Sequence, residues 1–188
     1  YEGWIDTKTI TPVDADLFTN IRQKKNHYVE TEVIREVWLG HNKVLIPAGS
    51  NLPAINKQDK TFSIGAYTFK YTGTINETKE KDIRKHLVER ALQFKHAPYL
   101  WGGKTCFGID CSGFNQVIYK TCGINLPRDA SQQAKSGQLV TNIEKAAMGD
   151  LAFFCKDTQR VVHTGIILNA HQIIHASGSV RIDTFDKQ

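Results

Sequence analysis

The fold of this chain is decided by the stretch Ile109-Asp110-Cys111-Ser112-Gly113-Phe114. Apolar residues at helical spacing run on from it, namely Phe114, Val117, Ile118 and Cys122. We therefore expect a helix over about 112–122, with Cys111 in its first turn. Backbone N–H groups are unpaired there and the helix dipole favours an anion, so both effects should lower the pKa of the thiol and make it a nucleophile. The alternative is a cysteine that packs as a small hydrophobic residue.

The composition is that of an ordinary soluble globular protein. The chain has 188 residues, of which 40% are hydrophobic and 23% charged, and its formal net charge is +5. The basic residues are spread along the chain and favour a solvated surface, so we expect no nucleic-acid partner. The apolar runs are too short to span a membrane. The first residue is Tyr1 rather than methionine, so we expect that an upstream segment has been removed.

The cysteines contain no CxxC pair, so their spacing does not predict a zinc ribbon. An even number would permit two disulfides, and one reactive thiol with three bystanders fits equally well. The four residues are Cys106, Cys111, Cys122 and Cys155.

The order of apolar patterns predicts an α+β fold with a domain boundary near Asn76. Residues 1–75 show short strand-like runs with turn residues between them, as in a small barrel. A helix is expected over 78–95 and a short helix within 126–133. An antiparallel meander should follow, because helices that precede a run of strands indicate this class. Its strands are expected over 150–155, 161–168, 172–175 and 180–184.

Two histidines in neighbouring strands of that meander are candidates for the base that a cysteine nucleophile needs. If the hairpin turns about Asn169, His163 and His175 face each other directly, with Cβ atoms roughly 5 Å apart. One imidazole could then orient the other through its second nitrogen. A three-ligand catalytic zinc site of Cys111, His163 and His175 is the competing interpretation, and each histidine alone could be merely structural.

In combination these motifs resemble the NlpC/P60 family over roughly residues 80–188. The matching pieces are Asp110 to Phe114, His163-Thr164-Gly165-Ile166, His175, and Tyr99-Leu100-Trp101-Gly102-Gly103. The resemblance implies a papain-like fold and a catalytic triad in which Cys111 is the nucleophile, His163 the general base and His175 the residue that orients it. It also implies cleavage of murein peptides beside D-glutamate, and it places an oxyanion-hole or substrate-binding tyrosine at Tyr99.

The first part of the chain is similar to bacterial SH3-like (SH3b) domains. The match covers Tyr1 to Ile5, as the end of a truncated copy within residues 1–11, and residues 12–75 as a divergent copy. With an NlpC/P60 domain behind it, this arrangement resembles the γ-D-glutamyl-L-diamino acid endopeptidases, which are dipeptidyl-peptidase VI-like. Such enzymes release L-Ala-γ-D-Glu from stem peptides with a free N-terminal L-alanine. The resemblance also implies that part of the amine-binding site comes from the SH3b region.

A substrate of that kind needs partners for an ammonium group and a carboxylate. Arg128 is the candidate for the D-Glu α-carboxylate, although Arg128 and Asp129 could instead cap a helix and form a surface ion pair. Trp101 could be a substrate platform, whereas Trp4 and Trp38 are better explained by core packing. The other candidates on the substrate side are Tyr99, Asp110, Ser112, Asp129 and Ser131.

The sequence thus predicts a cysteine endopeptidase with residues 1–76 as an SH3-like barrel and 77–188 as the catalytic domain. It is expected to hydrolyse the γ-D-glutamyl bond to L-lysine or diaminopimelate in cell-wall peptides. Two alternatives are a wall-binding scaffold and another acyl-transfer enzyme, such as an amidase or acyltransferase, on the same fold. We expect murein peptides as the partner, no cofactor, no metal and a monomer. The expected location is the bacterial cell envelope, with the cytoplasm as the alternative.

Overall fold

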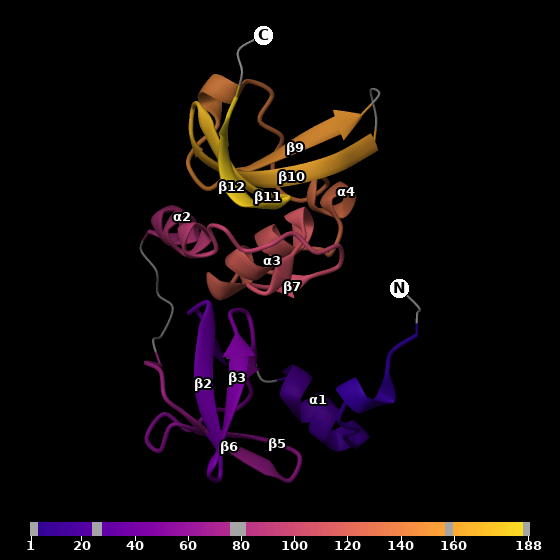
Figure 1. Ribbon diagram of the computed structural model, residues 1–188, viewed down its shortest axis with the longest axis vertical. Coiled ribbons are helices and arrows are strands. Elements are labelled where there is room, and N and C mark those ends of the chain that lie inside the picture. Colours follow the sequence, from indigo (N-terminus) through magenta and orange to yellow (C-terminus); the bar gives the residue numbers. More distant parts are fainter. Residues whose placement is uncertain (1–3, 24–27, 76–81, 157–159, 186–188) are drawn as a thin grey trace. The chain divides into compact units, whose positions relative to one another are not determined.

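The computed structural model describes residues 4–23, 28–75, 82–156 and 160–185 (Figure 1). The chain divides into two compact units, each considered by itself below. The first unit comprises residues 1–28, 36–44 and 51–75, and the second comprises 29–35, 45–50 and 76–188. Within the described residues, no helix is both long and apolar enough to cross a membrane.

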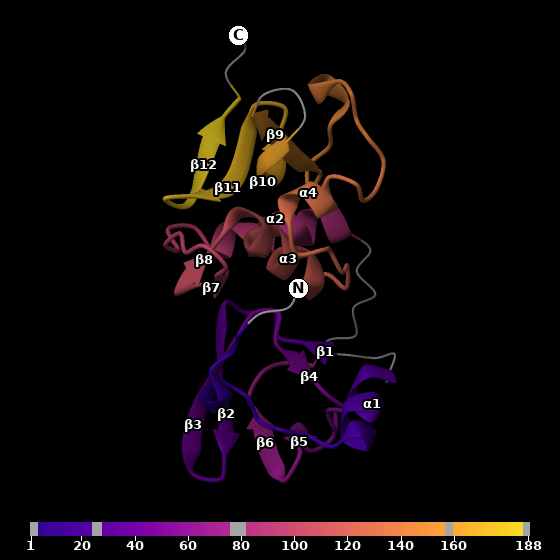
Figure 2. The ribbon, with the colours of Figure 1, turned by 90° about the vertical axis from the view of Figure 1, so that its right-hand side faces the viewer.

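The first unit contains most of an antiparallel sheet with the strand order β3-β2-β6-β5 (Figure 2). Phe62 and Phe69 face each other in the β5–β6 hairpin, and their rings stack with centroids 5.1 Å apart. Val37 opposes Tyr71 where β2 pairs with β6, and both are buried. The strands are β1 (Tyr28–Val29), β2 (Ile34–Leu39), β3 (Asn42–Pro47), β4 (Asn51–Leu52), β5 (Thr61–Ile64) and β6 (Tyr67–Tyr71), of which β1 pairs with β4.

The beginning of the chain differs from the strand-like pattern that the sequence suggests. A short 3₁₀ helix, η1 (Thr7–Thr9), is followed by an α-helix, α1 (Ala15–Gln23). The Asp14 side chain accepts a hydrogen bond from the Leu17 N–H at 2.7 Å, as an N-cap residue does. The strand expected over Tyr1 to Ile5 is wrong for its last two residues, which are exposed and belong to no strand, and its first three lie outside the described residues. The assignment of residues 1–76 to an SH3-like barrel stays a prediction.

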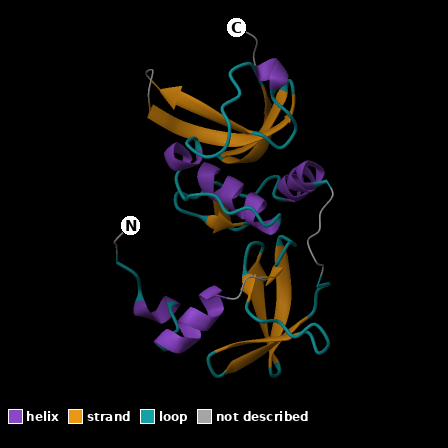
Figure 3. Cartoon of the chain, turned by 180° about the vertical axis from the view of Figure 1, so that it is seen from behind, coloured by secondary structure: helices purple, strands orange, loops and turns teal. Residues whose placement is uncertain are grey.

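The second unit is an α+β layer structure, in which helices cover one face of a four-stranded antiparallel sheet (Figure 3). The strand order is β12-β11-β10-β9, so each strand pairs with its neighbour in sequence. The helices α2 (Ile83–Gln93), α3 (Cys111–Thr121) and α4 (Ala130–Gln133) agree with the predicted ones to within a few residues, except that 78–81 are not described. The other elements are β7 (Lys104–Thr105), β8 (Gly108–Ile109), η2 (Ile143–Lys145), β9 (Leu151–Lys156), β10 (Arg160–Asn169), β11 (Gln172–Ser177) and β12 (Ser179–Thr184).

Helix α3 is the centre of the core of this unit. Phe114 and Ile118, one turn apart, are fully buried against Ile166 and Ile174 of the sheet. The Phe114 ring also meets Phe94 edge-on, with centroids 6.1 Å apart. Burial on nearly all sides fixes the position of this helix, and therefore that of the cysteine at its start.

The β10–β11 hairpin has a different register from the one that the sequence predicts. Asn169 pairs with Gln172, so the turn is centred after residue 170 rather than on Asn169, and a bulge lies between residues 167 and 169. The pairing of Ile166 with Ile174 puts His175 opposite Gly165, so the expected direct pairing with His163 is wrong. A Cβ atom on Gly165 would lie 2.7 Å from the Cβ of His175. The glycine is therefore needed for the two strands to approach here.

Candidate active site

Cys111 is the first residue of α3 and is half-buried. Asp110 is the N-cap residue, and its Oδ1 accepts a hydrogen bond from the Gly113 N–H at 2.6 Å. Gly113 has no space for a side chain, because a Cβ atom there would lie 2.5 Å from the carbonyl oxygen of Gly103. The cap and the glycine together let the segment before the helix pack closely against its first turn.

The Cys111 thiol does not have the lowered pKa that the sequence predicts. Burial, and then the charge of Asp110, raise its pKa above the ordinary value of 9.0. Hydrogen bonds from the backbone N–H groups of Thr164, Ser112 and Cys111 itself act in the opposite direction but are the weaker influence. The prediction of a lowered pKa is therefore wrong, because it counted the helix terminus but not the depth of burial. A thiol in this environment needs a base to become a thiolate.

The candidate for such a base is His163 on β10, directly before Thr164, whose backbone N–H acts on the thiol. Although His163 and His175 are diagonal rather than directly opposed, they project from the same face of the sheet and their rings touch. His163 Nε2 and His175 Nδ1 are 2.6 Å apart, and the ring centroids are 4.9 Å apart. Nδ1 of His163 is the ring nitrogen that this contact leaves for another partner.

Asp183 extends this contact and is absent from the sequence-based site. Its Oδ2 lies 3.0 Å from Nε2 of His175, and Arg181 donates to the same oxygen at 2.8 Å and 3.0 Å. The register of the β11–β12 hairpin, in which His175 opposes Arg181, brings Asp183 to a diagonal position on the same face. The turn is centred on Gly178, since Ser177 pairs with Ser179, whereas a two-residue turn at Ser177-Gly178, as the sequence indicates, would put Asp183 on the other face of the sheet.

A buried polar network joins α3 to the strand that carries the histidines. Asn115 Nδ2 donates to Thr164 Oγ1 at 2.9 Å, and Thr164 Oγ1 donates to the Ala152 carbonyl at 2.9 Å. Asn115 Nδ2 also lies 3.2 Å from Gln133 Oε1, and Gln133 Nε2 donates to the Ser112 carbonyl at 2.9 Å. All these side chains are buried, so their hydrogen bonds are strong constraints. They fix Cys111 relative to His163.

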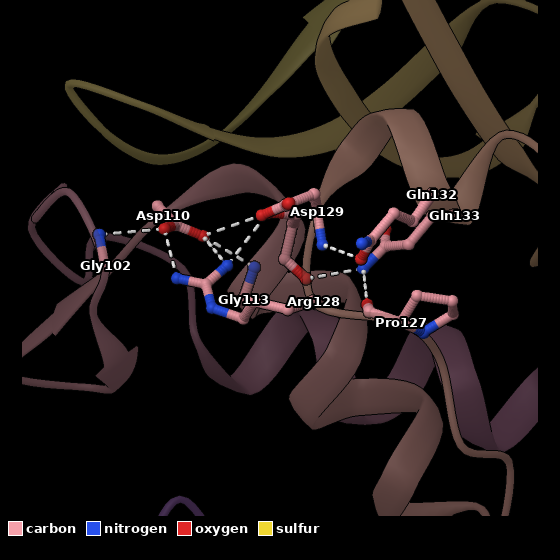
Figure 4. A network of polar contacts seen from close by, with 9 residues as sticks. Gly102, Asp110, Gly113, Pro127, Arg128, Asp129, Gln132 and Gln133 are labelled. Carbon is pink, nitrogen blue, oxygen red and sulfur yellow. Dashed lines mark hydrogen bonds and ion pairs between the residues drawn. The ribbon is translucent and has the colours of Figure 1, made fainter. Parts of the chain in front are cut away.

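Arg128 and Asp110 form a two-point ion pair beside Cys111 (Figure 4). Nη1 and Nη2 of Arg128 donate to Oδ1 and Oδ2 of Asp110 at 3.1 Å and 2.5 Å, and Nη1 also donates to Ser112 Oγ at 2.9 Å. The Gly102 N–H donates to Oδ2 at 2.8 Å. Burial alone would raise the pKa of Asp110, but the bonds from Arg128, Gly113 and Gly102 hold it below its ordinary value. Both carboxylate oxygens therefore accept hydrogen bonds from within the protein.

The remaining candidates for substrate binding differ in their exposure and contacts. Burial, then the charges of Cys111 and Asp110, raise the pKa of the Tyr99 hydroxyl, so its phenol lies within electrostatic range of the thiol. Asp129 is the N-cap residue of α4, and its N–H donates to Gln132 Oε1 at 3.3 Å. Ser131, one residue into α4, is exposed, and Trp101 is 86% exposed. The roles of these residues in substrate binding stay predictions.

The two tryptophans outside this cluster differ from each other. The expectation that Trp4 packs in a core is wrong, because its side chain is fully exposed. Trp38 is half-buried in β2, and the Lys43 ammonium lies 5.2 Å from the centroid of its ring.

The geometry of the histidine pair does not suit a metal bound by both rings. Zinc ligand nitrogens each lie about 2 Å from the metal, whereas the facing nitrogens of His163 and His175 are in direct contact with each other. In the part of the chain that the structure describes, no cluster of three or more His, Cys, Asp or Glu side chains has a metal-binding arrangement. The four cysteines, all described, form no disulfide.

A cysteine at the start of a helix, packed against an antiparallel sheet that carries two histidines in contact, defines this unit as a papain-like α+β domain. The sequence profile of the NlpC/P60 family matches residues 96–188. The chain belongs to the NlpC/P60 family.

The chain is similar to curated relatives in sequence and to a solved structure in fold. The γ-D-glutamyl-L-lysine dipeptidyl-peptidase of Bacillus subtilis (strain 168) is 31% identical over 66% of this chain and 44% of its own length. The murein DD-endopeptidase MepS/murein LD-carboxypeptidase of Escherichia coli (strain K12) is 30% identical over 72% of this chain and 74% of its own. The crystal structure of an NlpC/P60 family protein from Bacillus cereus ATCC 10987 superposes with a TM-score of 0.73 at 24% identity, over 88% of this chain and 61% of that one. The chain therefore spans less than half the length of the Bacillus subtilis relative.

Proposed function

We propose that this chain is a cysteine peptidase of cell-wall peptides, and that it cuts the γ-D-glutamyl bond to an L-diamino acid. The observation that carries the proposal is the contact between His163 on β10 and His175 on β11. Thr164, the residue after His163, acts on the Cys111 thiol through its backbone N–H. The name of the Bacillus subtilis relative supports this bond, and that of the Escherichia coli relative supports murein as the source of the substrate. We also propose an extracytoplasmic location, because murein lies in the cell envelope.

In the proposed reaction, Nδ1 of His163 takes the proton from the Cys111 thiol as the sulfur attacks the amide carbonyl. The backbone N–H of Cys111, in the first turn of α3 where no intrahelical acceptor is available to it, and the Tyr99 hydroxyl are assigned to the oxyanion. The His163 imidazolium then gives its proton to the leaving amine, and water hydrolyses the thioester. His175 holds the His163 ring in place throughout.

The experiment that tests the proposal compares free and blocked peptides. L-Ala-γ-D-Glu-L-Lys should yield L-Ala-γ-D-Glu and lysine by mass spectrometry, and the diaminopimelate peptide should yield the corresponding products. The N-acetylated peptide should be cut at least about tenfold more slowly, because burial of an ammonium partner without the ammonium is costly. Equal cleavage of both peptides would refute recognition of a free amine. No cleavage of either tripeptide, together with cleavage of D,D or L,D bonds in longer murein peptides, would instead match the activity named for the Escherichia coli relative.

On the acid side of the pH profile, kcat/KM should fall at a lower pH than the ordinary pKa of histidine would give. Burial, then the charges of His175 and Arg181, lower the pKa of His163 below 6.5, while Asp183 acts against them. A lowered pKa means that the neutral, base-competent ring persists to lower pH, so kcat/KM should be half-maximal below pH 6.5 on its acid side. The measurement is a kcat/KM profile with the free tripeptide, whose own carboxyl groups titrate at about pH 4 or below. An acid limb above pH 6.5 would contradict this assignment.

A further inference from the structure

The outer end of the histidine contact is a carboxylate on β12. Asp183 Oδ2 lies 3.0 Å from His175 Nε2, and the two donors from Arg181 reach the same oxygen at 2.8 Å and 3.0 Å. Arg181 and Asp183 are both partly exposed, with side chains 51% and 38% accessible, so as an ion pair alone they would add little to stability. Their effect on the histidine beside them is the more consequential one.

The carboxylate determines where the protons of both rings lie. Hydrogen bonds from Arg181, and then from His175, lower the pKa of Asp183 despite the opposing effect of burial, so this side chain is ionised at neutral pH and can only accept. His175 must therefore carry its proton on Nε2, which leaves Nδ1 with a lone pair. That lone pair accepts a hydrogen bond from Nε2 of His163, so Nδ1 of His163 has no proton.

We propose that Asp183 is a positioning residue of the candidate catalytic centre, the fourth member of a chain that runs from Cys111 through His163 and His175 to the carboxylate. It fixes both rings in the Nε2–H tautomer and presents Nδ1 of His163 as a free base. The proposal rests on the proposed function, because it concerns the same centre. Asp183 acts only through His175 and does not touch the substrate.

The charge of Asp183 has a second effect, on the protonated state of His163. When the thiol proton moves from sulfur to Nδ1 of His163, the ring becomes a cation and the sulfur an anion, with no net change in protons. His175 and Arg181 disfavour that cation, whereas Asp183 favours it. Phe154, the aromatic neighbour with its centroid 5.8 Å from that of His163, is uncharged. Asp183 should therefore increase the fraction of Cys111 present as thiolate.

Two readouts that need no substrate test this role. Alkylation of Cys111 by iodoacetamide at pH 7, followed on the Cys111 peptide by mass spectrometry, reports the thiolate, and ¹⁵N chemical shifts of the histidine rings report their tautomers. Asp183→Ala should expose the Nδ1–H form of His175 and slow alkylation roughly three- to tenfold, since a tenfold change corresponds to one pKa unit. Asp183→Asn keeps an acceptor oxygen beside Arg181, so it should keep the tautomers and slow alkylation to a smaller extent. Glu144→Gln removes an exposed carboxylate elsewhere in the unit and should change neither readout.

The outcomes separate the two proposals. Native tautomers together with native alkylation rates in both Asp183 variants would overturn the role of Asp183, as would a proton on Nδ1 of His163 in the unaltered chain. If Asp183→Ala fails to fold, the nearly isosteric Asp183→Asn variant still tests the effect of the charge. If the unaltered chain does not cleave the tripeptide but alkylation and tautomers behave as expected, the proposed function fails while the role of Asp183 stands.

Discussion

Replacing Cys111 with alanine should reduce turnover of L-Ala-γ-D-Glu-L-Lys by about 10⁴-fold or more, to the background rate. In the proposed reaction the acyl group is transferred to the sulfur that this variant lacks, and losses of this size are typical when a nucleophile is removed. The fold should survive, because alanine is tolerated in the first turn of a helix and Cys111 is only half-buried. The measurement is release of L-Ala-γ-D-Glu over time with the variant at high concentration.

Cys155→Ala is the matched control for this loss, since Cys155 is an exposed cysteine on β9 and its replacement should leave turnover unchanged. If the turnover of Cys111→Ala were within tenfold of that of the unaltered chain, the assignment of the nucleophile would be contradicted. The zinc interpretation makes a different prediction, namely loss of activity with a chelator and recovery with zinc. Inactivation by thiol alkylation without any effect of a chelator would remove it.

Replacing Arg128 with methionine should lower the free energy of unfolding by about 2–4 kcal/mol, because it leaves the buried Asp110 carboxylate without its cation. Only 8% of the Asp110 side chain is accessible, so water cannot take the place of the guanidinium. Urea denaturation of the variant at pH 7 measures this change. The low pKa of Asp110 means that the stabilisation is present above the pKa of the unfolded carboxyl and is lost as pH falls through the folded value.

A double variant gives the internal control for Arg128. Asp110→Asn combined with Arg128→Met removes both charges while keeping an N-cap acceptor, so it should be less destabilised than the sum of the two single variants. Strict additivity would mean that the two charges do not interact. Peptidase activity of the same variants is a separate measurement, because Arg128 is also the predicted partner of the D-Glu carboxylate.

The parts of the fold that could be predicted are those in which one pattern dominates a segment. The helix that begins at Cys111 and the four strands that follow η2 have clear periodicity, and their bounds agree closely with expectation. Helix α1 was missed although Leu17, Phe18 and Ile21 recur at helical spacing and the capping residue Asp14 was a usable signal. The strands β7 and β8 are each two residues long, which is too short for an alternation of apolar and polar residues to be recognised.

In the candidate site, residue types were predictable and their environments were not. The contact between His163 and His175 follows from two strands and a turn. The register of these strands, however, depends on a bulge that no residue type predicts. The raised pKa of Cys111 depends on burial by distant segments, which a local motif does not contain. The pairing of Arg128 with Asp110 joins residues 18 positions apart and required the tertiary fold.

The β10–β11 hairpin does not tolerate substitution of Gly165. Ile166 and Ile174 can exchange for other aliphatic residues by small adjustments of packing. At residue 165 any side chain displaces His175, so no single substitution there is neutral for both the sheet and the histidine contact. A deep mutational scan of this strand selected only for folding and one selected for turnover should therefore agree at 165, whereas at 163 and 175 the two selections should diverge.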